Sequence, residues 1–190
     1  MRLFLLLFCV FLSGCTVSHH PPLWAVPHEK LIYDKLQQIK IERWGEEQFH
    51  GIIALKAAEG GLHYALLDGT GVKLLQGWSD ARGEHDAVLP TGPLVSRGLA
   101  QFVSEALARM FLLEPGIYPC SRVGFSSLCL KTLETGAIVK AGYFTGVKIW
   151  QVEAQLNDPL HNSTATESYI EYNQPWLGVT IVLQNMTKKD

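Results

Sequence analysis

The 190-residue sequence lacks a long apolar run, an excess of basic residues and the common catalytic signatures. No stretch holds the 18 or more uninterrupted apolar residues that predict a membrane-spanning helix. Lysine and arginine number 16 against 18 aspartates and glutamates, and the net charge of −2 gives no electrostatic basis for binding nucleic acid. The sequence contains no Gly-x-Ser-x-Gly elbow and no phosphate-binding glycine loop. These absences argue against a spanning protein, a nucleic-acid partner and the familiar hydrolase and nucleotide-binding classes.

Histidine is present at seven positions, but none has the spacing of a metal site. His85 precedes Asp86 and follows Ser79, yet a catalytic triad is a spatial arrangement that this proximity does not predict. We therefore expect no catalytic residue, no metal, no cofactor and no enzymatic activity. The alternative is an enzyme acting on acyl or peptidoglycan substrates, which would need a cluster of perturbed carboxylates, histidines or serines in one cleft.

The first 15 residues have the order of a bacterial signal peptide. Arg2 precedes about ten apolar residues at positions 3–12, a run too short to span a bilayer. The segment Leu12-Ser13-Gly14-Cys15 resembles the lipobox, which implies cleavage before Cys15 and lipid attached to its sulfur. Two or three acyl chains, palmitate among them, would hold the chain stably on a membrane. The alternative is a secreted protein with a cysteine there by chance.

The signal peptide and the residues that follow it predict three segments: a lipoprotein signal peptide at 1–14, a tether at 15–28 and a single domain at 29–190. Pro21, Pro22 and Pro27 favour an extended tether. Thr16 follows the cysteine, where an aspartate would resemble an inner-membrane retention signal of enteric bacteria. We therefore expect a lipid-anchored protein on the outer membrane, facing the periplasm. The sequence predicts no oligomeric state.

Two further cysteines, Cys120 and Cys129, lie in the expected domain. The periplasm is oxidising, so an even pair there is able to form a disulfide. Two buried thiols are the alternative, because bridging depends on geometry that spacing alone does not reveal.

Apolar periodicity predicts strands on both sides of one helix. The helix covers 94–113, where apolar residues recur at helical spacing and the polar face carries Arg97, Gln101, Ser104, Glu105 and Arg109. Residues 31–44 are interpreted as a short helix running into a strand, and 79–93 and 157–167 as loops. The expected strands are 49–58, 62–67, 72–78, 123–132, 138–143, 147–152, 169–172 and 177–184.

This order of elements predicts a mainly β, α+β fold. Strands do not alternate with helices, so a parallel sheet is not expected. An antiparallel curved sheet or half-barrel of seven or more strands around one central amphipathic helix fits the pattern best.

Several segments carry a family resemblance: the lipobox, the meander at 49–55 and 62–67, the segment 71–76, the helix near 94–113 and the strand at 176–181. Together they resemble the DUF3261 lipoproteins, which are thought to share the LolA/LolB-like fold of the outer-membrane lipoprotein receptor LolB. The resemblance covers roughly residues 30–185. It implies an eleven-strand half-barrel lidded by helices, with an apolar cavity for acyl chains. LolB-type receptors also use an exposed apolar loop residue, which has no clear counterpart in the loop at 79–93.

The resemblance leads to the expectation that the domain binds or transfers acyl chains or lipoproteins in an apolar half-barrel cavity. The side chains proposed to line it are Trp78, Phe102, Met110, Phe111 and Trp150. The alternative for these five residues is ordinary core packing, since helical spacing alone explains Phe102 and Met110. A second function is a scaffold lipoprotein of an envelope assembly, acting through its outer surface.

Overall fold

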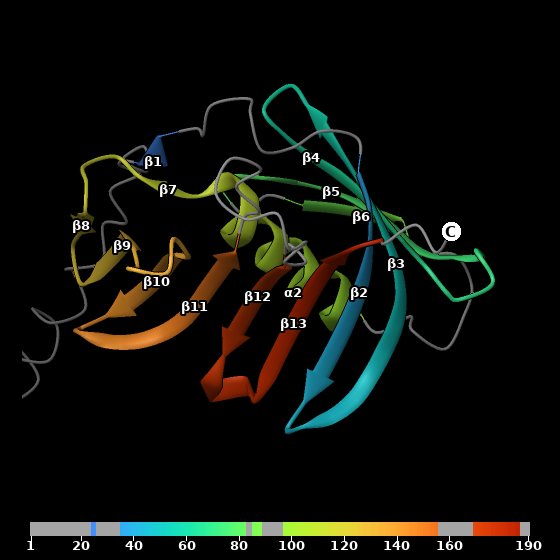
Figure 1. Ribbon diagram of the computed structural model, residues 1–190. Coiled ribbons are helices and arrows are strands. Elements are labelled where there is room, and N and C mark those ends of the chain that lie inside the picture. The colour runs from blue at the N-terminus through green and yellow to red at the C-terminus, as the bar shows by residue number, and fades with distance from the viewer. Residues whose placement is uncertain (1–23, 26–34, 83–84, 89–96, 156–168, 187–190) are drawn as a thin grey trace, which may run out of the picture.

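The computed structural model describes residues 24–25, 35–82, 85–88, 97–155 and 169–186 (Figure 1). Among these residues, eleven antiparallel strands form one open, curved sheet, and two short strands form a separate pair. The strands are β1 Trp24–Ala25, β2 Lys35–Arg43, β3 Glu46–Ala58, β4 Gly61–Leu67, β5 Lys73–Asp80, β6 His85–Val88, β7 Glu114–Pro115, β8 Cys120–Val123, β9 Ser126–Thr132, β10 Ile138–Phe144, β11 Val147–Gln155, β12 Tyr169–Gln174 and β13 Val179–Asn185. The mainly β, α+β architecture is the one that the sequence predicts.

The strand order of the large sheet is β6-β5-β4-β3-β2-β13-β12-β11-β10-β9-β8. Every neighbouring pair except β2 with β13 is also consecutive along the chain. The pairing of β2 with β13, in which Ile41 lies opposite Ile181, therefore joins the two halves of the chain into one sheet. The edge strands β6 and β8 do not pair with each other, so the sheet curves without closing into a barrel.

Within the described part of the chain, one helix lies inside the curve of this sheet (Figure 1). Helix α2 covers Arg97–Leu107 and continues into a π-helical turn, η1, at Ala108–Leu112. A short 3-10 turn, η2, covers Pro175–Leu177 between β12 and β13. No helix among the described ranges is long and apolar enough to cross a membrane.

Alternate residues of the strands face the helix and form the core. Val103, Ala106 and Leu107 of α2 are almost fully buried. They pack in one cluster with inward-facing residues of both halves of the sheet, such as Leu66 and Leu183. Each large apolar side chain removed from water in this way contributes about 1.5–3 kcal/mol. This shared core fixes the helix against the concave face.

A buried polar contact also fixes the helix. Ser104, which the helical pattern places on the polar face, is only 1% exposed. Its Oγ atom lies 2.5 Å from the hydroxyl of Tyr64, and its carbonyl accepts a hydrogen bond from the Ser79 hydroxyl at 3.1 Å. The prediction for Ser104 is wrong because the sheet curves further around the helix than one amphipathic face requires.

Other local predictions also differ from the structure. The expected loop at 79–93 contains the edge strand β6, and β5 runs on to Asp80. The expected strand at 123–132 is interrupted by a turn between β8 and β9. The segment 31–44 was expected to begin as a short helix, but residues 35–43 are strand throughout. Residues 31–34 lie outside the described residues. Leu177 belongs to η2 and is 44% exposed, whereas the other three residues of its predicted face, Val179, Ile181 and Leu183, are buried.

Candidate functional site

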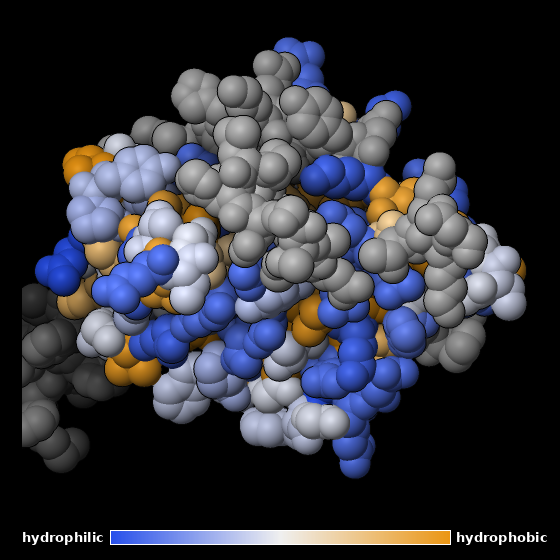
Figure 2. Space-filling view, in the orientation of Figure 1, coloured by the Kyte–Doolittle hydropathy of each residue, from blue (hydrophilic) through white to orange (hydrophobic). Residues whose placement is uncertain are grey.

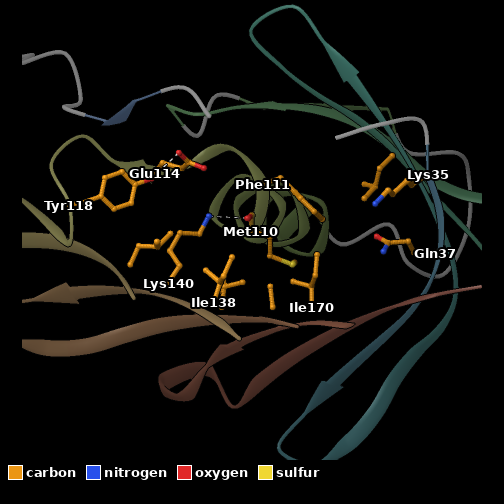
Figure 3. Close-up of a pocket in the computed structure, with 13 residues that line it drawn as sticks. Lys35, Gln37, Met110, Phe111, Glu114, Tyr118, Ile138, Lys140 and Ile170 are labelled. Atoms are coloured by element: carbon orange, nitrogen blue, oxygen red, sulfur yellow. Dashed lines mark hydrogen bonds between the residues drawn. The ribbon is translucent and has the colours of Figure 1, made fainter. Parts of the chain in front are cut away.

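A cavity of about 230 Å³ lies between η1 and the concave face of the sheet (Figure 3). The apolar side chains that line it come from both layers: Leu55, Met110, Phe111, Leu130, Ile138, Val152, Ala154 and Ile170. Its polar lining consists of Lys35, Gln37, Glu114, Tyr118 and Lys140. The volume is below the roughly 300–1,000 Å³ of sites for drug-sized ligands, which favours a slender ligand.

The polar groups are separated into the two ends of the cavity. Figure 3 shows Glu114, Tyr118 and Lys140 at one end, and Lys35 with Gln37 at the other. Apolar side chains of η1 and the sheet lie between these ends. A ligand with a polar end and an apolar body matches this distribution.

The turn η1 supplies the apolar roof. The Leu113 backbone N–H donates to the carbonyl of Ala108 at 2.9 Å, the five-residue step that defines a π turn. Such turns are rare in proteins, and those that occur frequently lie at functional sites. This one places the adjacent residues Met110 and Phe111, both less than a tenth exposed, against the same cavity.

Lys140 is the most unusual polar group of the cavity, because a lysine is seldom fully buried. It is 6% exposed, and its Nζ donates to the carbonyls of Met110 at 2.9 Å and Leu113 at 2.7 Å. Burial lowers the pKa of Lys140 from 10.5 to about 8, and the nearby carboxylate of Glu114 partly offsets this effect. An ammonium group has three donors, so beside these two bonds within the described residues a third donor can bond an acceptor on a ligand or a water molecule.

Glu114 and Tyr118 complete the same end of the cavity. The Tyr118 hydroxyl donates to Oε2 of Glu114 at 3.4 Å. The pKa of Tyr118 is raised, first by desolvation and then by the negative charge of Glu114. At the other end, Nε2 of Gln37 donates to Oδ1 of Asn185 at 3.2 Å. Each end therefore offers hydrogen-bonding groups whose side chains are held by partners.

A disulfide stabilises the segment that carries Tyr118. Cys120 and Cys129 lie directly opposite each other on β8 and β9, and their sulfur atoms are bonded. Beside the bridge, the Leu130 N–H donates to the carbonyl of Pro119 at 2.8 Å. Because Tyr118 is two residues from Cys120, the bridge restricts the movement of this end of the cavity.

The five residues predicted to line a cavity fall into three groups. Met110 and Phe111 line the cavity. Phe102 and Trp150 instead pack on Tyr172 in the core, with ring centroids 6.2 and 6.5 Å apart. Trp78 does not line the cavity. The alternate residues Leu75, Gly77 and Ser79 of β5 face inward, so the half-buried ring of Trp78 lies on the other side of the sheet.

Trp150 borders a second, more open hollow of about 440 Å³. The guanidinium of Arg109, which also lines this hollow, lies 5.7 Å from the centre of the Trp150 ring. The guanidinium already donates to the Tyr172 hydroxyl at 2.6 Å and forms an ion pair with Glu105 at 3.3 Å. Since its charge is already partnered, this hollow is a weaker candidate for a ligand site.

Sequence reasoning missed Lys140, Glu114, Tyr118, Lys35 and Gln37. A polar residue on a strand ordinarily faces solvent, so the sequence does not predict that these side chains line a cavity. The one local signal for a buried polar residue is Lys140, a lone lysine in the apolar segment 137–143. The contact of Lys140 with the carbonyls of η1 depends on tertiary structure.

Comparisons with known proteins leave the site to be interpreted on its geometry. No protein-family model matches the chain, and no curated protein matches its sequence. Among the described residues, no group of three histidine, cysteine or acidic side chains is arranged to hold a metal ion.

Proposed function

We propose that this protein is a lipoprotein, anchored through Cys15 to the outer membrane and facing the periplasm, whose half-barrel binds a single acyl chain. The observation that carries the proposal is the apolar cavity between η1 and the sheet, with polar groups confined to its ends. The eleven strands around one helix agree with the LolB-like half-barrel that the resemblance to DUF3261 lipoproteins implies.

The polar end at Lys140 suits the head of a fatty acid or the ester of an acylated lipid. The remaining donor of the Lys140 ammonium would bond a carboxylate or carbonyl oxygen, and the apolar tail would run between Met110 and Ile138 toward Lys35. A hydrogen bond to a charged group contributes about 1.5–3 kcal/mol, enough to orient a slender ligand.

The anchor is tested by metabolic labelling with palmitate. We expect the label in the wild-type chain and its loss in Cys15→Ser, with the labelled protein in the outer-membrane fraction. A wild-type chain that takes up no label would contradict the anchor and leave the cavity to be tested separately.

The cavity is tested by titrating the mature protein with a dansyl-labelled fatty acid and by native mass spectrometry for bound lipid. Ala154→Trp would fill the cavity and weaken binding at least about tenfold, because the indole would occupy the space of the tail. Lys131→Trp is the matched control, since Lys131 is exposed on β9 and does not line the cavity. Equal binding by the two variants, with both folded by circular dichroism, would reject the proposal.

Lys140→Met separates head from tail recognition. We expect this variant to bind the fatty acid about tenfold less tightly, with little change for the corresponding fatty alcohol, because only the acid presents a carboxylate. Equal losses for both ligands would place the head elsewhere.

A further inference from the structure

Four hairpin tips lie next to one another along one margin of the sheet, and each carries exposed apolar side chains. They are the turns β2–β3, β12–β13, β10–β11 and β8–β9, along the lower and left margin of Figure 1. We call the following six residues the apolar rim: Trp44, Trp176, Leu177, Phe144, Val147 and Phe125. They are six of the eleven exposed large apolar side chains in the described part of the chain. Figure 2 shows pale and orange side chains along this margin, interrupted by charged ones.

Contacts between neighbouring tips make the apolar rim continuous. The Thr145 N–H donates to the carbonyl of Phe125 at 2.8 Å, and the Phe125 and Phe144 rings pack edge to face with centroids 6.4 Å apart. The indole N–H of Trp176 donates to the carbonyl of Lys148 at 3.2 Å. These contacts tie three of the four tips together while the apolar surfaces of the rings stay exposed.

Trp44 joins the fourth tip to the others. Its backbone N–H donates to the carbonyl of Gly178 at 2.6 Å, and its ring lies where a side chain at position 178 would be. Trp44 is nevertheless 68% exposed. The ring is thus positioned by the neighbouring hairpin without being covered by it.

The backbone at Trp44 is one that tryptophan rarely adopts. Trp44 and Gly45 are the two central residues of the β2–β3 turn, with φ of 54° and 81°. Such two-residue turns favour asparagine and glycine, and a bulky residue with positive φ is an outlier. An exposed tryptophan in a position that disfavours it points to a role of the side chain outside the fold.

We infer that the apolar rim is a membrane-contacting surface whose aromatic side chains insert into the interfacial layer of a phospholipid bilayer. Tryptophan is enriched at that layer, where its ring is both apolar and able to donate a hydrogen bond. The rim residues stand on four separate turns in a row, which suits shallow insertion into a lipid surface better than a compact protein interface, whose centre is one packed patch.

The tether keeps the domain near that bilayer. This argument rests on the proposed lipid anchor at Cys15. Trp24 of β1 follows Cys15 by nine positions, and a fully extended chain of nine steps spans at most about 30 Å. The anchor therefore holds Trp24 within about 30 Å of the membrane surface, and contact through the rim would set the orientation of the domain.

Charges beside the apolar rim are mixed. Arg43 and Lys148 are exposed next to the tips, and so are Glu46 and Glu47. Because neither sign dominates, contact depends on apolar insertion and changes little with salt or with the fraction of anionic lipid.

The test is quenching of tryptophan fluorescence by brominated phosphatidylcholine, with the lipidated mature protein reconstituted in vesicles. We expect quenching in the wild type and its loss in the double variant Trp44→Asn/Trp176→Phe. Asparagine before Gly45 preserves the turn, so folding is not at issue. The control Trp78→Phe removes a tryptophan outside the rim and does not reduce the quenching.

A second variant keeps both rim tryptophans. Phe125→Ser/Phe144→Ser removes two insertion points, and we expect it to reduce the quenching of the remaining rim, whereas Leu36→Ser, at the opposite end of β2, has no effect. Equal quenching in the wild type and both rim variants overturns the inference, and so does cross-linking of rim residues between two copies.

The outcomes are separable from those of the proposed function. The dansyl titration reports on the cavity and palmitate labelling reports on the anchor, whereas quenching reports on the rim alone. If the mature protein carries no lipid, flotation of that protein with phosphatidylcholine vesicles measures the rim directly, and failure of the wild type to float more than the rim variants rejects the inference.

Discussion

The ammonium of Lys140 on β10 lies 2.7 Å from the carbonyl oxygen of Leu113, at the end of the π turn. The last carbonyls of a helix have no partner within the helix and carry partial negative charge. Lys140 supplies a donor from the sheet to two of them, since it also bonds Met110. The helix end, the roof of the cavity and the sheet are therefore joined at one buried charge.

The burial of Lys140 makes stability depend on pH. Its pKa is lowered from 10.5 to about 8 in the folded protein, so between these values the unfolded chain binds a proton that the folded chain does not. Stability therefore rises with pH across this window, by about 3 kcal/mol in full. We expect the free energy of unfolding of the wild type, relative to Lys140→Met, to increase from about pH 7.5 to about pH 10 in urea titrations.

The control for this prediction is Lys131→Met, on the exposed side of β9. Its free energy of unfolding should follow the wild type across the same range. Parallel curves for the wild type and Lys140→Met would show that the ammonium is not buried as described.

Reduction of the disulfide between Cys120 and Cys129 should destabilise the domain. The two cysteines are nine residues apart. A bridge that closes a loop of this length lowers the entropy of the unfolded chain, which stabilises the folded state by about 2–3 kcal/mol. We expect a loss of that size in the free energy of unfolding when a reductant is added. The variant Cys120→Ala/Cys129→Ala should show the same loss and no response to the reductant, and a response in that variant would assign the effect elsewhere.

The hydroxyl pair Tyr64–Ser104 should show strong coupling. Both residues are buried, and Tyr64→Phe leaves the Ser104 hydroxyl without its 2.5 Å partner, at a cost of about 1–3 kcal/mol. Ser104→Ala has a similar cost. We expect the double variant to lose less than the sum of the two, as measured by a double-mutant cycle in urea. Strict additivity would show that the two hydroxyls do not depend on each other.

Apolar alternation was sufficient to predict the central strands but not the edges of the sheet. The expected strands 62–67 and 138–143 correspond to β4 Gly61–Leu67 and β10 Ile138–Phe144. The edge strands β6 and β8 are short and contain polar residues such as Asp86 and Arg122. A strand that pairs on one side only needs little apolar alternation, so its sequence resembles that of a loop.

The candidate site could be predicted only in its helical part. Met110 follows from the helical spacing of apolar residues, whereas Phe111 lies outside that spacing and lines the same cavity from the π turn. The burial of Lys140 could not be predicted, because its hydrogen-bond partners lie at the end of the helix, far away in sequence, and come close to it only in the folded chain. The exposed turn at Trp44 had a local signal, since the Trp44-Gly45 pair places a glycine where a tight two-residue turn needs one.

Gly178 should tolerate alanine less well than Gly146, although both glycines have positive φ. The backbone at Gly146, with φ of 84°, has open space where a Cβ would lie, so Gly146→Ala costs only backbone strain, about 1 kcal/mol. At Gly178, with φ of 60°, the Cβ would also collide with the Trp44 ring. We expect Gly178→Ala to cost about 1–3 kcal/mol more than Gly146→Ala in urea denaturation, and the excess to disappear when Trp44→Asn is present. An excess that persists without the indole would mean that the Trp44 ring does not rest on Gly178.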